Sequence, residues 1–127
     1  MPILEVEMVI GSGEVLTDGL AEGMADAAGD VFGAPAGRTW VRLHTLPASE
    51  YAENGGGPPE GIRPVFVTVL RASLPKEDAL REETRRLTEA IATACGRPAE
   101  NVHILWLPEA TGRMAFGGRL METTESR

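Results

Sequence analysis

The chain has 127 residues, which is enough for one domain with a single buried core. Hydrophobic residues make up 43% of it and charged residues 24%, so wholesale disorder is not expected. The formal net charge is −7, which argues against nucleic acid or an anionic membrane surface as the main partner.

The amino-terminal part predicts a strand, a helix and a second strand. Residues 3–10 are rich in Ile, Val and Leu, as a half-buried strand is, and Gly11 interrupts the run. Apolar residues then recur at three- and four-residue spacing, as on the buried face of one helix. They are Leu16, Leu20, Met24, Ala27 and Val31. Gly33 and Pro35 stop this helix, and residues 40–46 form the second predicted strand.

The carboxy-terminal part predicts the same three elements. Residues 65–70 read as a strand, Ser73 is the expected N-cap of the next helix, and Pro75 is expected in its first turn. The buried face of this helix is predicted to hold Leu80, Thr84, Leu87, Ile91 and Ala94. Gly96 ends the helix, and residues 101–107 form the closing strand.

The two parts align as copies of one unit, because four landmarks recur at a nearly constant offset. They pair 33–36 with 96–99, 41–47 with 102–108, 55–56 with 117–118, and Pro2 with Pro64. We therefore expect a single domain over 1–127, made of two β-α-β halves, 1–57 and 64–127, with a linker at 58–63.

The expected fold class is α/β, in an α+β layer arrangement. Right-handed crossovers place two tandem β-α-β units in one four-stranded sheet, with both helices on one face. The other face of the sheet is then bare. Because apolar residues occur on both faces of the predicted strands, we expect the bare face to be buried, most simply by association with further copies of the chain.

Pro2 is the sharpest candidate for chemistry. Removal of Met1 would make it a secondary amine, and an unperturbed α-amine has a pKa of about 7.7–8.0. Partial burial or nearby arginine charge would lower that pKa toward neutrality, which gives a general base or nucleophile without any side chain. Pro64 has the same place in the second half, but its nitrogen is part of an amide and cannot act as a base.

Other kinds of site find little support. The lone Cys95 excludes an intrachain disulfide and a cysteine-built metal site, and it is expected to be packed rather than reactive. His44 and His103 lie in predicted strands without carboxylates at ligand spacing, and no phosphate-binding loop is present, so no metal or cofactor is expected. No apolar run could span a bilayer and no signal peptide is evident, which predicts a cytoplasmic protein.

Arginines at the ends of predicted elements are candidates for binding an acid. They are Arg42, Arg71, Arg97 and Arg113. The whole negative excess lies in residues 1–63, so an acid-binding site would have to gather arginine locally. Solvated surface positions, and a coding bias toward arginine, explain the same residues equally simply.

Together these features resemble the tautomerase superfamily, specifically its fused 4-oxalocrotonate tautomerase-like members. The resemblance spans essentially the whole chain and is carried by Met1-Pro2, the two β-α-β copies and the tail at 112–120. That tail, Gly-Arg-Met-Ala-Phe-Gly-Gly-Arg-Leu, is similar to the family's carboxy-terminal hairpin, in which an aromatic residue precedes a Gly-Gly pair.

The resemblance implies a homotrimer with inward-facing sheets and a cofactor-independent isomerase of aromatic catabolism. In it, Pro2 would be the general base and acid on an unsaturated 2-hydroxy or 2-keto acid. The substrate-binding residues that it implies are Arg42, Arg71, Arg113, Met114 and Phe116. Two alternatives stay open: a proline-dependent hydratase, dehalogenase or decarboxylase acting on a three-carbon acid, and a non-catalytic trimeric protein that binds small acids.

The chain departs from the family pattern at several positions. The arginine that precedes the first helix in the family is replaced by Ser12, and by Leu74 in the second half. His103 stands in the second half where Arg42 stands in the first, and the aromatic position of the tail holds Met114. These departures bear on the substrate more than on the proline chemistry.

Overall fold

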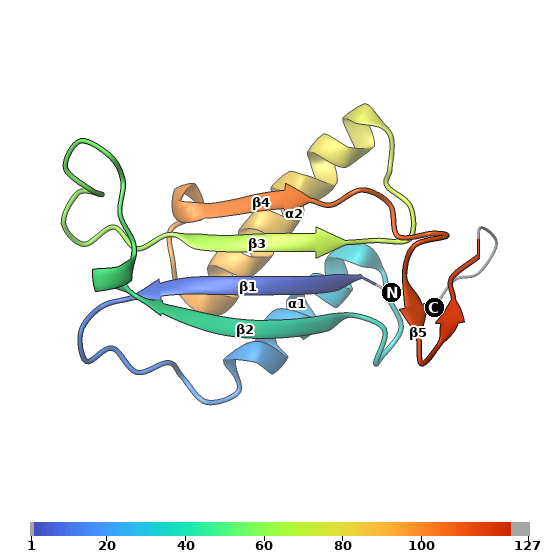
Figure 1. Ribbon diagram of the computed structural model, residues 1–127, viewed down its shortest axis with the longest axis horizontal. Helices are drawn as coiled ribbons and strands as arrows, with labels where there is room; N and C mark the ends of the chain where they lie inside the picture. The colour runs from blue at the N-terminus through green and yellow to red at the C-terminus, as the bar shows by residue number, and fades with distance from the viewer. Residues whose placement is uncertain (1, 123–127) are drawn as a thin grey trace.

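The structure, a computed structural model that describes residues 2–122, alternates strands and helices in two successive β-α-β units (Figure 1). The main elements are β1 (Ile3–Ile10), α1 (Leu20–Phe32), β2 (Trp40–Pro47), β3 (Val65–Leu70), α2 (Glu77–Cys95) and β4 (Val102–Trp106). Short 3-10 turns at Ala48–Glu50 and Ala99–Asn101 and a small hairpin of β5 (Ala115–Phe116) and β6 (Arg119–Leu120) complete the described chain.

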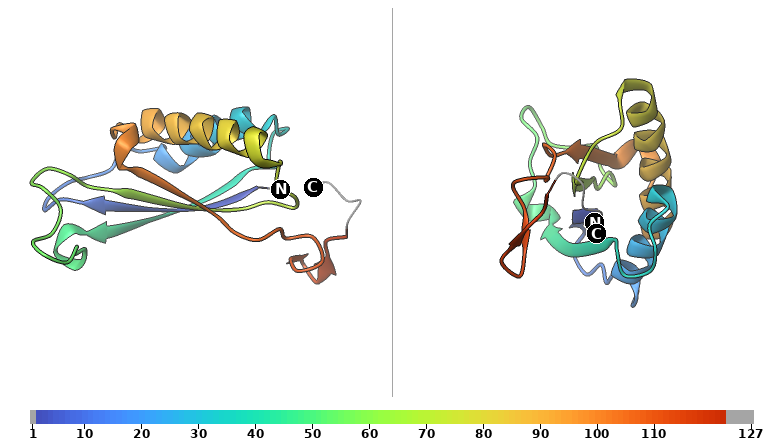
Figure 2. Two further views of the ribbon diagram at one scale, coloured as in Figure 1. Left: turned by 90° about the horizontal axis from the view of Figure 1, so that it is seen from above. Right: turned by 90° about the vertical axis from the view of Figure 1, so that its right-hand side faces the viewer.

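The four long strands form one mixed sheet in the order β2-β1-β3-β4. Each β-α-β unit contributes a parallel pair, β1 with β2 and β3 with β4, and the two units meet through antiparallel pairing of β1 with β3. Both helices cover the same face of this sheet (Figure 2). The expected fold class, a four-stranded sheet with two helices on one face, is therefore confirmed.

The core lies between the sheet and the helix layer. Alternate residues of a strand point to opposite faces, and the buried set on the two central strands follows that period. It comprises Leu4, Val6 and Met8 on β1 and Val65, Val67 and Val69 on β3. The helices bury Met24, Ala28, Leu87 and Ile91 against these strand residues. On α1, the fully buried alanine is therefore Ala28 and not the predicted Ala27.

The opposite face of the sheet is open in the single chain and is more polar than the sequence predicted. Phe66 lies on this face between Tyr51 and His103, with ring centroids 5.9 and 5.5 Å away, and Leu105 is 60% exposed. The exposed carboxylate of Glu5 shares the face, because β1 alternates between buried and exposed positions.

Both helices end at the predicted glycines, but the predicted N-cap of α2 differs from the structure. Gly33 and Gly96 adopt positive φ angles of 63° and 69° and close α1 and α2, as predicted. The prediction of Ser73 as an N-cap is wrong, because α2 begins only at Glu77. Pro75 disfavours helical backbone at Leu74, whose N–H instead donates to the Glu109 carboxylate at 2.7 Å.

The predicted carboxy-terminal hairpin is present. Ala115 pairs with Leu120 and Phe116 with Arg119, and the Gly117-Gly118 pair between them has φ angles of 59° and 88°. Two successive positive φ angles are the requirement of the tightest hairpin turns, which glycine meets without strain.

Leu87 should be a large contributor to stability because its side chain is fully buried between α2 and the sheet. We expect Leu87→Ala to lower the free energy of unfolding by about 2–5 kcal/mol, through lost apolar burial and the cavity left behind. Denaturant unfolding at a fixed protein concentration measures this. Val15→Ala is the control, because Val15 is 88% exposed, and an equal loss in both variants would contradict the described core.

Candidate functional site

Pro2 is buried and directly precedes β1, at the end of the sheet where β2 begins and β3 ends. On one side, the backbone N–H of Trp40 donates to the Pro2 carbonyl oxygen at 3.0 Å. On the other side, Ile3 pairs with Leu70 in the antiparallel ladder, so the next step of the register places Pro2 opposite Arg71.

Arg71 is held on the helix side of the sheet by contacts with both helices. Its guanidinium carbon lies 5.1 Å from the ring centroid of Phe32, the last residue of α1, and its Nη1 forms an ion pair with Glu83 of α2. The Arg71 and Glu83 side chains are only 21% and 16% exposed. Strand alternation places Pro2 on the same face, because both Pro2 and Arg71 continue the buried positions of their strands.

The hairpin reaches the same end of the sheet through an aromatic contact. Phe116 packs edge-on against Trp40, with ring centroids 5.5 Å apart and an interplanar angle of 85°. The hairpin lies on the side of the sheet away from the helices (Figure 2). Trp40 therefore links Phe116 to the backbone of Pro2 from the face opposite Arg71.

The described contacts of Arg42, Arg113 and Met114, the other substrate-binding candidates, are with residues other than Pro2. Arg42 lies on the open face, where its Nη1 is 3.3 Å from a Glu5 carboxylate oxygen and its side chain is 64% exposed. Arg113 is exposed, and its Nη1 donates to the Glu109 carbonyl oxygen at 3.3 Å. Met114 is half-buried, and its carbonyl oxygen accepts the N–H of Met121 at 2.8 Å.

Arg97 supports the far end of the sheet. Its Nη1 donates to the carbonyl oxygens of Val9 and Arg63 at 3.0 and 2.7 Å, and its Nη2 pairs with the Glu14 carboxylate at 3.0 Å. The N–H of Gly11, together with Arg97, holds the pKa of the Glu14 carboxyl below its usual value. These bonds tie β1 to the segment that precedes β3, so Arg97 is a structural residue.

The sequence alone does not single out three residues at the Pro2 end. Phe32 directly precedes the glycine that ends the first predicted helix, Trp40 begins a predicted strand, and Glu83 lies in a charged stretch typical of a solvated helix face. Trp106 Nε1 donates to Thr84 Oγ1 at 2.9 Å, which fixes the α2 turn that carries Glu83 against β4. Only this packing distinguishes Glu83 from the exposed Glu82 beside it.

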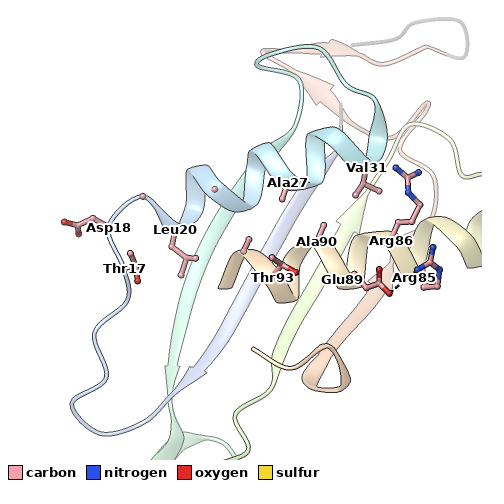
Figure 3. A pocket seen from close by; sticks show the side chains of 13 residues that line it. Thr17, Asp18, Leu20, Ala27, Val31, Arg85, Arg86, Glu89, Ala90 and Thr93 are labelled. Carbon is pink, nitrogen blue, oxygen red and sulfur yellow. Dashed lines mark hydrogen bonds and ion pairs between the residues drawn. The ribbon is translucent and has the colours of Figure 1, made fainter. Parts of the chain in front are cut away.

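A hollow of about 850 Å³ lies elsewhere, between the outer surfaces of α1 and α2 (Figure 3). It is lined mostly by small residues, and none of the predicted site residues borders it. Its lining includes two arginines, Arg85 and Arg86, of which Arg85 is already bonded to the carboxylates of Glu82 and Glu89. Because the hollow holds none of the predicted site residues, the candidate site stays at the Pro2 end of the sheet.

Residues 2–122 contain no group of three His, Cys, Asp or Glu side chains that could hold a metal ion. Over the same residues, no helix combines the length and apolar character needed to cross a membrane.

Comparisons with known proteins identify the fold. No family model and no curated protein matches the sequence. Among solved structures, a fused 4-OT, a wild-type symmetric trimer, superposes with a TM-score of 0.74 at 19% identity, over 98% of this chain and 99% of that one. A protein inactivated by 2-oxo-3-pentynoate gives a TM-score of 0.70 at 20% identity, over 95% of both chains. The chain has the tautomerase-superfamily fold.

A third neighbour of the same fold is a malonate semialdehyde decarboxylase inhibited by 3-bromopropiolate. It has a TM-score of 0.66 at 18% identity, over 91% of this chain and 88% of that one. At such identities the likeness establishes the fold alone. It confirms, at the level of fold, the resemblance carried by Pro2, the repeat and the hairpin, and the solved neighbours include enzymes and a trimer.

Cys95 should react slowly in the folded protein. It is half-buried at the end of α2, its Sγ donates to the Ala92 carbonyl oxygen at 3.8 Å, and burial raises the pKa of the thiol. We expect iodoacetamide at pH 8 to modify Cys95 more slowly than free cysteine, and at the free-thiol rate after unfolding in urea. Mass spectrometry follows both reactions, and equal rates in the folded and unfolded protein would contradict the described packing.

Proposed function

We propose that the protein is a cofactor-independent tautomerase. In this proposal Pro2, freed of Met1, is the general base and acid for keto-enol tautomerisation of an unsaturated 2-hydroxy or 2-keto acid. The observation that carries the proposal is the place of Pro2, buried at the sheet end and opposite Arg71 in the antiparallel register.

The proposed reaction moves one proton and needs no other reactant. The neutral Pro2 nitrogen removes the hydroxyl proton of the enol acid, and the protonated amine then returns a proton to carbon as the double bond shifts, giving the keto acid. Burial favours the neutral amine that this first step requires, whereas the charge of Arg71 is offset by its ion pair with Glu83. The Arg71 guanidinium would hold the substrate carboxylate and stabilise the negative charge that develops on oxygen.

The chemistry of the solved neighbours supports a small unsaturated acid as ligand. One of them is inactivated by 2-oxo-3-pentynoate and another is inhibited by 3-bromopropiolate. Both compounds combine a carboxylate with an unsaturated carbon chain, which is the class proposed here.

The second candidate is a proline-dependent hydratase, dehalogenase or decarboxylase acting on a three-carbon acid. The half-buried carboxylate of Glu83 favours it, because activation of water needs such a group near the substrate. The ion pair with Arg71 weakens this candidate, because the carboxylate is already bonded to a guanidinium. Turnover of malonate semialdehyde or 3-chloroacrylate, in place of enol acids, would establish it.

Pro2→Ala should reduce kcat/KM for ketonisation of phenylenolpyruvate by about 10²–10⁴-fold, the usual contribution of a general acid–base group. Ultraviolet absorbance follows the reaction, and intact mass tests whether Met1 has been removed. The chain offers a matched control in Pro64→Ala, because Pro64 is also buried and precedes β3 as Pro2 precedes β1. Equal activity in Pro2→Ala and the wild type, or full activity with Met1 retained, would refute the proline mechanism.

The proposed assembly is a homotrimer in which neighbouring copies cover the open face of the sheet. Light scattering at micromolar concentration should give the mass of three chains, and Phe66→Glu should reduce it, because that change buries a new carboxylate in each copy. Val15→Glu adds the same charge at an exposed position away from the sheet and should leave the mass unchanged. A monomeric wild type would refute this assembly.

A further inference from the structure

Glu83 balances the charge of the arginine beside Pro2. The two side chains form a direct ion pair, and both are mostly shielded from solvent. On the segment after β4, the Ala110 N–H donates to the Arg71 carbonyl oxygen at 2.8 Å, and Ala110 is flanked by Glu109 and, three residues on, Arg113, one charge of each sign. The charge of Arg71 is therefore offset mainly by the carboxylate of Glu83.

Although Glu83 offsets its charge, Arg71 can still bind one further carboxylate. A guanidinium carries five N–H donors, and the bond to Glu83 occupies only one nitrogen, Nη1. The ring of Phe32 covers one face of the guanidinium and leaves its edge available for hydrogen bonding. Arg71 can thus bridge Glu83 and a single substrate carboxylate.

A second substrate carboxylate near Arg71 would be repelled by Glu83. It would lose water on entering the site and would add to the negative charge already held there. On the helix side, the ring of Phe32 lies against the Arg71 guanidinium, whereas Trp40 and Phe116 pack together on the opposite face. An aromatic ring such as that of Phe32 favours an apolar or aromatic substrate tail.

We infer that the site selects acids with one carboxylate and an apolar tail, and that Glu83 is the residue that discriminates against dicarboxylates. This inference rests on the proposed function in that the acid is held next to Pro2. Specificity here arises from a repulsive group as much as from an attractive one.

The test compares a monocarboxylic and a dicarboxylic substrate. In the wild type, kcat/KM for phenylenolpyruvate should exceed that for 2-hydroxymuconate, and Glu83→Gln should reduce this preference roughly tenfold by removing like-charge repulsion. The change should lie mainly in KM for the dicarboxylate. Glu82→Gln is the matched control, because Glu82 is adjacent on α2 but exposed and bonded to Arg85, and it should leave the preference unchanged.

A binding measurement separates this inference from the proline mechanism. Quenching of tryptophan fluorescence should report tighter binding of cinnamate than of muconate, with the difference reduced in Glu83→Gln and kept in Glu83→Asp, which retains the charge. Equal binding of the two acids by the wild type, or an equal loss of preference in both Glu83 variants, would overturn the inference. If the preference is reduced in Glu83→Gln and kept in Glu83→Asp while Pro2→Ala stays active, the proline mechanism is refuted and the inferred specificity is supported.

Discussion

The antiparallel pairing of β1 with β3 is the constraint on which the rest of the structure depends. Each half of the chain forms a parallel pair around its own helix, and only this central ladder joins the halves into one sheet. Its register brings the start of β1 to the end of β3 and so sets Pro2 opposite Arg71. A shift by one residue would turn one of the two side chains to the other face of the sheet.

The helix layer then determines what surrounds Arg71. α1 ends at Phe32 and α2 passes Glu83 over the same strand end, so an aromatic ring and a carboxylate reach one guanidinium from two helices. The bond between Trp106 and Thr84 fixes α2 against β4 one residue from Glu83. The orientation of the Arg71 side chain therefore depends on the packing of the helices against the sheet and not on the loop that carries it.

The overall charge of −7 says little about the ligand. Most of the acidic excess lies on exposed positions, such as Glu22 and Asp26 of α1, where water screens it. At the Pro2 end, Arg71 and Glu83 compensate each other with little exposure to solvent. This pair is the basis on which we propose an acid with a single carboxylate as the ligand.

Local chemistry made most of the fold predictable. Strands with period-two burial, amphipathic helices closed by Gly33 and Gly96, and a Gly-Gly hairpin turn are all fixed by nearby residues. The start of α2 could not be predicted from nearby residues, because the Leu74 N–H donates to the carboxylate of Glu109, thirty-five residues further along the chain.

The candidate site divides in the same way. The sequence by itself singled out Pro2 through its position and the repeat, and Arg71 through its place at the end of a strand. The tertiary structure alone decided that Arg42 lies on the open face with Glu5, and that Glu83 and Phe32 converge on Arg71. The physical reason is that periodicity tells which side of its own element a residue faces, whereas partners from other elements depend on sheet register and helix packing.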